Sequence, residues 1–438
     1  MKKFVFITLI FCFTSTAAVA QTQDEQANSG SVYSKLGIGY PVGMSNTSAR
    51  SLGLTGVSYN ETYVAGLTNP AHWGHTVFGL GAGSVGINSY NASEASAEAR
   101  NVHFGIHQFQ LQLPIIRGKF GISASFSPVT QSNFRNYQED VMDTGTGAAQ
   151  DTLLYGIENR GSGGANRAEL GFGWRITPHI SVGYAASVVF VSLDDRYTGV
   201  FGNRNYQTVG YTLETSGSGF GNRFGTYIRI PELLGSEDQL GIGASVNLPV
   251  SIDAQRKQTA DLGSSSISTE DGENLGDGTI TLPMTINAGL SYHPNRLTMF
   301  ATEAKYEKWS NFDNDFKPSE GSLFTDRYKY GLGFQYFPYI TGSNKFLSKF
   351  KYRLGVSYDT GHLKIQGEKI NTLKFSFGLG ILSPQFLSPR SNSNSTIDLS
   401  FEYGLRGTQS MNLVEEQIWG VRLSLNLAEL MFFRPKLQ

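Results

Sequence analysis

Apolar residues alternate with small or polar ones along most of this chain, from about residue 75 to near its C-terminal end. In residues 280–292, Ile, Leu, Met, Ala and Tyr occupy the even positions, and Thr, Pro, Asn, Gly and Ser the odd ones. Residues 180–190 and 419–427 show the same period of two. That period indicates β-strands whose two faces meet different surroundings. Several runs exceed the roughly 5–6 residues usual in soluble sheets and suit the roughly 9–11 that cross a bilayer.

The spacing of these runs predicts an all-β protein, a transmembrane antiparallel β-barrel of about fourteen strands. Short joins near 115–117, 177–178, 231–238 and 294–295 alternate with long polar ones at 131–163 and 251–276. Short turns on one side and long loops on the other are typical of an outer-membrane barrel with an even number of strands. Longer joins near 341 and 384 leave the count open by two. The expected strands are 76–90, 101–113, 118–130, 164–176, 179–195, 208–230, 237–250, 277–293, 295–309, 325–338, 347–359, 368–382, 395–405 and 414–430.

The stretch Ser48–Gly74 precedes the first strand and does not resemble one. It is rich in small residues and contains the triplet Asn69-Pro70-Ala71. Proline lacks an N–H and fixes φ, so this stretch cannot be central in a sheet. We expect it to form a hatch, or plug, inside the barrel, with Asn69, Pro70 and Ala71 at its gate.

Glycines and charges fall on the face of the strands that alternation assigns to the lumen. Glycine in a strand often marks close approach by another backbone, so a thinned wall would leave room for a plug, although glycine easing barrel curvature explains the pattern equally well. Charges on the lipid face would cost roughly 2–4 kcal/mol near the midplane. We expect the lumen charges either to brace the plug or to line a solute pathway. The glycine pairs are Gly171/Gly173, Gly241/Gly243, Gly331/Gly333 and Gly378/Gly380, and the main lumen charges are Arg353, Lys374, Asp398, Glu402 and Arg422.

The N-terminus predicts export. Met1-Lys2-Lys3, a short apolar core and small residues at Ala18 and Ala20 are typical of a secretory signal peptide. We therefore expect residues 1–20 to be the signal peptide, 21–74 the tail and hatch, and 75–438 the barrel. Cys12 is the single cysteine, so cleavage after Ala20 leaves no thiol for a disulfide; a lipoprotein acylated at Cys12 is disfavoured because bulky Phe11 precedes it.

Composition and local motifs argue against other classes. The 35 basic and 36 acidic residues nearly cancel and form no long basic run, which disfavours nucleic acid as a partner. His103 and His107 share one strand face but lie about 13 Å apart, too far to bind one metal ion. Acidic stretches at 271–274 and 313–315 lack the spacing of a calcium loop. We expect no enzyme activity, cofactor or metal, although a hydrolase triad assembled across strands would leave no local motif.

The two ends of the chain resemble the FadL/TodX family of outer-membrane transporters for hydrophobic compounds. The resemblance rests on the signal peptide, the segments Tyr33–Gly39 and Arg50–Leu54, the triplet, and an ending from Arg406 through Leu427 to Lys436 that is similar to members from Bacteroidetes-type bacteria. It implies a 14-stranded barrel in the outer membrane of a Gram-negative cell, with an N-terminal hatch that contains the triplet.

From these observations we expect passive uptake of a hydrophobic small molecule, such as a long-chain fatty acid, through a hatch-gated barrel set in outer-membrane lipid. Apolar side chains among the external loops would capture the ligand, and the candidates are Phe134, Tyr137, Leu153, Leu154 and Tyr155. The alternative is a barrel of the same family that acts as a secretion or assembly accessory and binds a protein partner. An apolar pocket continuous with the lumen would favour transport, whereas a blocked lumen would favour the accessory role.

Overall fold

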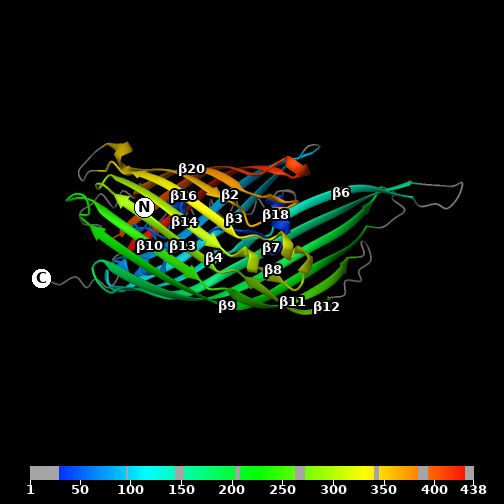
Figure 1. Ribbon diagram of the computed structural model, residues 1–438, viewed down its shortest axis with the longest axis horizontal. Coiled ribbons are helices and arrows are strands. Elements are labelled where there is room, and N and C mark those ends of the chain that lie inside the picture. The colour runs from blue at the N-terminus through cyan, green and yellow to red at the C-terminus, as the bar shows by residue number, and fades with distance from the viewer. Residues whose placement is uncertain are drawn as a thin grey trace, which may run out of the picture.

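The computed structural model describes residues 29–94, 97–143, 152–202, 208–261, 272–339, 345–382 and 393–429, and the expected signal peptide lies outside these ranges. The described strands form an antiparallel β-barrel of fourteen wall positions, closed by the pairing of β22 with β2, as the sequence predicted (Figure 1). In order around the wall they are β2 (Gly79–Ser93), β3 (Glu98–Ile116), β4 (Phe120–Pro128) with its continuation β6 (Phe134–Asp143), β7 (Thr152–Arg175), β8 (Ile180–Phe201), β9 (Val209–Pro231), β10 (Gln239–Asn247) with β11 (Val250–Asp261), β13 (Thr285–His293) with β12 (Glu273–Leu282), β14 (Thr298–Glu307) with β15 (Asp313–Asn314), β16 (Arg327–Tyr336), β17 (Phe350–Asp359), β20 (Thr372–Leu382), β21 (Ser393–Gly407) and β22 (Glu415–Glu429).

Short elements lie before the wall and between its strands. The N-terminal segment contains η2 (Val32–Lys35), β1 (Tyr40–Pro41), α2 (Thr47–Arg50) and η3 (Pro70–His75); β1 pairs with β5 (Thr130–Gln131). The connections between the wall strands contain η4 (Trp309–Asn311), η5 (Pro318–Leu323), η6 (Phe346–Lys349), β18 (Lys364–Ile365), β19 (Glu368–Lys369) and η8 (Ser410–Asn412). Among the described residues, no helix is long and apolar enough to cross a membrane.

Burial along the strands is inverted relative to a soluble protein. On β21, Ile397 and Phe401 are 46% and 41% exposed, whereas Asp398 and Glu402, on the opposite face, are buried. The same alternation on the other strands gives the barrel an apolar outer surface. The interior is polar along much of the wall but also holds an apolar cluster that includes Val189, Ile252 and Ile280. An apolar outer band is stable only in lipid, and a closed barrel satisfies the backbone hydrogen bonds there.

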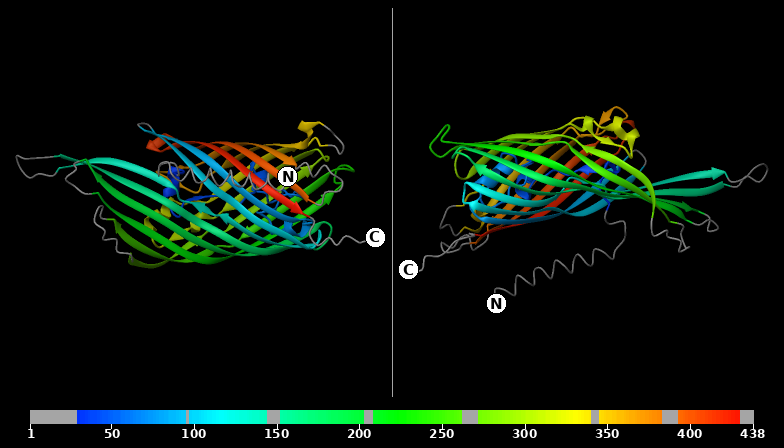
Figure 2. Two further views of the ribbon diagram at one scale, coloured as in Figure 1. Left: turned by 180° about the vertical axis from the view of Figure 1, so that it is seen from behind. Right: turned by 90° about the horizontal axis from the view of Figure 1, so that it is seen from below.

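Three neighbouring strands are far longer than a bilayer requires. β7, β8 and β9 contain 24, 22 and 23 residues, against the roughly 9–11 that span a membrane. Their outer halves project beyond the rest of the barrel together with β6 (Figures 1 and 2). The prediction of long loops at 131–163 and 251–276 is therefore wrong in part, because β6, half of β7, β11 and β12 occupy much of them. We call the sheet formed by β6 and the outer halves of β7–β9 the overhang.

The N-terminal segment lies inside the ring of strands (Figure 1). Ala49, Leu52, Ala65 and Trp73 are at most 1% exposed although they belong to no wall strand. A short helix can form here because the Asn46 side chain caps α2, accepting a hydrogen bond from the Ala49 amide at 2.8 Å. We call residues 29–78 the plug.

Candidate functional site: a plugged lumen with an enclosed polar chamber

The plug packs directly on the wall where glycines remove the side chains. A Cβ added at Gly333 would lie only 2.7 Å from the Leu52 carbonyl oxygen. A Cβ at Gly331 or Gly355 would lie at least as close to the backbone of Leu52 and Gly53. Gly53 itself has φ +71°, and a Cβ there would meet the Val356 carbonyl at 2.7 Å. Side chains at these positions would force the plug away from the wall. Here the lumen glycines make room for another backbone.

Asn69 ties the plug to the wall through a side chain that is completely buried. Its Nδ2 donates to the carbonyl of Val57 in the plug and to that of Thr226 on β9, both at 2.9 Å. Its Oδ1 accepts from the Ala71 amide at 3.0 Å, which caps η3, and Pro70 occupies the first turn, where no N–H is needed. One amide therefore satisfies three backbone groups in an irregular stretch. Whether this triplet gates the lumen stays a prediction.

Two ion-pair clusters join plug to wall. Arg50 of α2 pairs with Glu402 of β21, with Nη2 to Oε2 at 2.7 Å. Glu61 accepts from Lys351 at 3.0 Å and lies 3.5 Å from Arg353, which also pairs with Asp398 at 2.6 Å. Burial opposes ionisation of Glu61, but Lys351 and Arg353 outweigh burial and lower its pKa to about 2.

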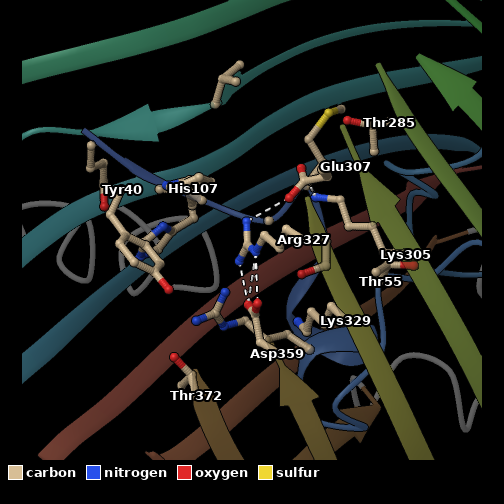
Figure 3. A pocket seen from close by; sticks show the side chains of 18 of the residues that line it. Tyr40, Thr55, His107, Thr285, Lys305, Glu307, Arg327, Lys329, Asp359 and Thr372 are labelled. Carbon is tan, nitrogen blue, oxygen red and sulfur yellow. Dashed lines mark hydrogen bonds and ion pairs between the residues drawn. The ribbon is translucent and has the colours of Figure 1, made fainter. Parts of the chain in front are cut away.

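A chamber of about 150 Å³ lies between the plug and the wall (Figure 3). On the side nearest the outer end of the barrel, Arg327 binds Glu307 at 2.8 Å through Nη1 and Asp359 at 2.9 Å through Nε. Lys305 reaches Glu307 at 2.7 Å. Figure 3 shows Lys329 beside this network and Tyr40 and His107 across the chamber. This side of the chamber is thus charged, whereas Val250, Leu282 and Ile418 contribute apolar lining elsewhere.

Aromatic rings close the chamber toward the outer end. Trp309, Phe312, Phe324 and His362 pack together with ring centroids 4.5–6.0 Å apart. We call these four residues the outer cap. Tyr40 joins the cap to the chamber, because its ring lies 5.0 Å from that of His362 and 3.8 Å from the Arg406 guanidinium carbon. The described lumen is therefore blocked from above as well as filled by the plug.

The residues proposed for ligand capture lie on strands of the overhang, not in loops. Phe134 and Leu153 are 3% and 6% exposed, whereas Tyr137 and Leu154 are 55% and 50% exposed. The register places Tyr137 and Leu154 on one face of the overhang and Phe134, Leu153 and Tyr155 on the other. The five therefore form no common apolar surface, and their role in capture stays a prediction.

All five predicted lumen charges face the interior, but they do not behave alike. Arg353, Asp398 and Glu402 are in close ion pairs, and Lys374 lies 3.8 Å from Glu402. Arg422 is 5% exposed and donates a hydrogen bond to the Ser45 carbonyl at 3.4 Å. His103 and His107 are also buried in the lumen, and no group of three or more potential metal ligands occurs within the described residues.

Sequence reasoning missed Glu303 on β14, a wall residue that accepts five hydrogen bonds from the plug. Its two oxygens accept hydrogen bonds from backbone and hydroxyl groups of Thr55, Gly56 and Ser58. Period-two alternation does place Glu303 in the lumen phase, opposite Thr302. Its partners come from an irregular segment almost 250 residues away, which no local pattern connects to it.

Comparison with solved structures finds proteins of similar fold. A FadL homologue from Pseudomonas aeruginosa has a similar fold, with a TM-score of 0.56 at 11% identity over 89% of this chain and 99% of that one. The Pseudomonas putida toluene transporter TodX is less similar (TM-score 0.48, 14% identity, 84% and 93% coverage), as is TbuX from Ralstonia pickettii (0.47, 14%, 82% and 92%). The class is thus a FadL-like β-barrel.

A family model described as BamG matches residues 1–438, and the chain belongs to the BamG family. No curated protein matches it by sequence.

Proposed function

We propose that this protein is an outer-membrane accessory barrel that binds a protein partner during secretion or outer-membrane assembly. The observation that carries the proposal is the blocked polar lumen. The chamber inside it has a volume of about 150 Å³, whereas pockets for drug-sized ligands measure about 300–1,000 Å³ and are mostly apolar. A chamber of this size with buried ion pairs does not accommodate a long apolar chain, so the barrel serves here better as a scaffold than as a conduit.

The overhang offers a surface for such a partner. Roughly ten residues of each long strand lie beyond a bilayer span, which corresponds to a projection of about 30 Å. Its exposed side chains include apolar Val141, Leu154 and Val200 on the face that also carries the Arg135–Glu158–Arg160 cluster. Apolar residues with a charged rim are typical of protein interfaces. Membership of the BamG family also favours an assembly role.

A second candidate function is hatch-gated uptake of hydrophobic compounds such as long-chain fatty acids. It is favoured by the FadL-like fold and by an apolar hollow of about 1,020 Å³ on the membrane face of the wall. The hollow on the outer surface of the wall is lined in part by Gly333 and Gly355. Leu52 of the plug lies against the same two glycines from inside the barrel. A movement of the plug would therefore open the barrel where its wall is thinnest.

One deletion strain distinguishes the two functions. In it, the rate at which newly made outer-membrane barrels acquire heat-modifiable mobility is measured by pulse-chase, and uptake of radiolabelled oleate is measured in the same cells. The strain is complemented with the wild-type gene or with a variant in which residues 136–159 are replaced by a short turn. Slow barrel maturation that only the wild-type gene restores would support the accessory role.

Normal maturation with lost oleate uptake would instead establish the transport function. If maturation and uptake are both unchanged by the deletion, both proposals are wrong. We expect the truncated variant to migrate as a folded barrel, because its membrane-spanning strands are unaltered. Its heat-modifiable mobility is the control for folding.

A further inference from the structure

Four cations gather at one side of the chamber around a single carboxylate. They are Arg50 from the plug, Lys329 from β16, Lys374 from β20 and Arg422 from β22, and all four line the chamber. Glu402 pairs closely with Arg50 and lies 3.8 Å from Lys374. Among the described residues, no carboxylate lies within 4 Å of Lys329 or Arg422. The cluster therefore carries an excess of positive charge.

Most of the other cations that line the chamber have a carboxylate partner. Arg327 and Lys305 share Glu307 and Asp359, Arg406 pairs with Glu416 at 3.1 Å, and Arg223 pairs with Glu169. Arg167, which also lines the chamber, shares the charge of Glu169 with Arg223. In the cluster around Arg50, that residue repels Lys329, Lys374 and Arg422 electrostatically. Glu402 offsets part of the repulsion on Lys374 and Arg422, and Asp359 offsets part of that on Lys329.

Arg422 makes the imbalance most evident. Its side chain is 95% buried, and its one hydrogen bond within the described structure, to the Ser45 carbonyl, is long at 3.4 Å. A guanidinium has five donors, and a buried cation without a partner is strongly unfavourable. Arg422 points into a cavity instead of packing against a carboxylate, which is the arrangement expected where an anion completes the site.

The size of the chamber restricts the anion. A volume of about 150 Å³ corresponds to about five water molecules at roughly 30 Å³ each. A tetrahedral oxyanion with a few waters fits this space, whereas an acyl chain does not. Guanidinium groups bind two oxygens of such an anion at once, and lysines add point charges.

We propose that the chamber binds a compact oxyanion of the phosphate class, held by Arg422, Lys329 and Lys374 on the wall and by Arg50 on the plug. Because Arg50 belongs to α2, the bound anion links the plug to three strands that are not neighbours in sequence. Free inorganic phosphate and a phosphomonoester group share this chemistry. The proposal is independent of the partner-binding function.

The test uses the full-length protein purified in a non-ionic detergent. Equilibrium dialysis with radiolabelled inorganic phosphate measures binding at constant ionic strength set by sodium chloride. Wild type should show saturable binding of one phosphate per barrel. Arg422→Gln and Lys374→Gln should each weaken the affinity by about tenfold, the effect of losing one charge-assisted hydrogen bond. Lys364→Gln, an exposed cation on β18, is the matched control and should bind like wild type.

Competition by glycerol 3-phosphate would identify a phosphomonoester as the ligand, and competition by phosphate alone would identify the free ion. Absence of saturable binding in the wild type would overturn the proposal, as would equal affinity in both lumen variants. Heat-modifiable mobility reports whether each variant is folded. If Arg422→Gln does not fold, Lys374→Gln decides the outcome, because its side chain is only partly buried.

Discussion

Glu303 on the barrel wall accepts two hydrogen bonds from Ser58 of the plug, one from its amide and one from its hydroxyl, both at 2.9 Å. Its other oxygen accepts from the Thr55 amide and hydroxyl at 2.7 and 2.6 Å. A single carboxylate thus replaces the water that these plug groups would otherwise bind. Hydrogen bonds to a charged acceptor contribute about 1.5–3 kcal/mol each, so this contact fixes the plug more firmly than an exposed ion pair would.

Glu303→Gln is expected to loosen the plug without preventing barrel folding. The amide retains one acceptor but turns an NH₂ group toward plug donors, which we expect to weaken plug attachment by about 2–4 kcal/mol. Planar-bilayer recordings should show openings that are rare in the wild type. Glu214→Gln, on an exposed position of β9, is the control and should leave conductance unchanged. Equal closure in both variants would show that Glu303 does not hold the plug.

Reversal of a lumen charge should have a larger effect. Arg353 is fully buried and contacts Asp398, Gln335 and Glu61. Arg353→Glu would leave three carboxylates together without their shared cation, a loss of about 3–5 kcal/mol for a broken buried pair. Liposome swelling should increase relative to Lys257→Glu, an exposed charge reversal on β11. A large conductance in the wild type itself would instead indicate an open pore and contradict the plugged lumen.

The plug should also detach more readily in acid, because it buries neutral histidine. Burial lowers the pKa of His72 to about 3, assisted by repulsion from His75. Neither ring nitrogen of His72 has a hydrogen-bond partner within the described part of the chain. An unfolded histidine has a pKa near 6.5. Below that value the unfolded chain binds a proton that the folded one does not, so stability falls as the pH drops from about 6.5 toward 3.

At pH 4.5 this single residue should cost about 2–3 kcal/mol of stability relative to pH 7. The temperature of the heat-modifiable transition measures the effect. His72→Gln cannot be protonated, so its transition should shift less between the two pH values than that of the wild type. Parallel shifts in the two proteins would place the acid sensitivity elsewhere.

The fourteen wall positions could be predicted because lipid and lumen impose opposite demands on alternate residues. Where that contrast is lost, the prediction failed. β6 has the sequence Phe-Arg-Asn-Tyr-Gln-Glu-Asp-Val-Met-Asp, in which polar residues fall on both faces, because both faces of the overhang lie outside the membrane. The chamber could not be foreseen for another reason. Its cations were visible as lumen-phase residues, but the pairing of Arg50 with Glu402 joins positions 352 residues apart, and so the excess charge emerges only from the fold.

The triplet offered a stronger local signal than its partners did. A residue before proline is biased toward the extended region, and Asn69 has φ −118° and ψ 110° before η3 begins at Pro70. The identity of the carbonyls that bind its amide could not be inferred. Val57 and Thr226 are ordinary apolar and polar residues whose backbone, not side chain, makes the contact.

Replacing Asn69 and Pro70 together with alanine tests whether the triplet is part of a gate. The double variant removes the amide that satisfies three backbone groups of the plug and wall, and it frees φ at position 70. Because the affected groups lie in the plug and only one wall carbonyl is involved, the barrel should still assemble. Leaving buried backbone groups unpaired should weaken plug attachment by about 1–3 kcal/mol for each group.

Three quantities are measured together in cells that depend on this protein. They are the uptake of radiolabelled oleate, the maturation rate of other outer-membrane barrels, and the heat-modifiable mobility of the variant. Thr62 is an exposed residue of the same plug, and Thr62→Ala is the control for general disturbance of this segment. A folded barrel with altered uptake would make the triplet a gate, because only the connection between plug and wall has changed. Loss of heat-modifiable mobility would make it a structural turn needed for folding. A folded double variant with normal uptake and normal maturation would remove the triplet from either function.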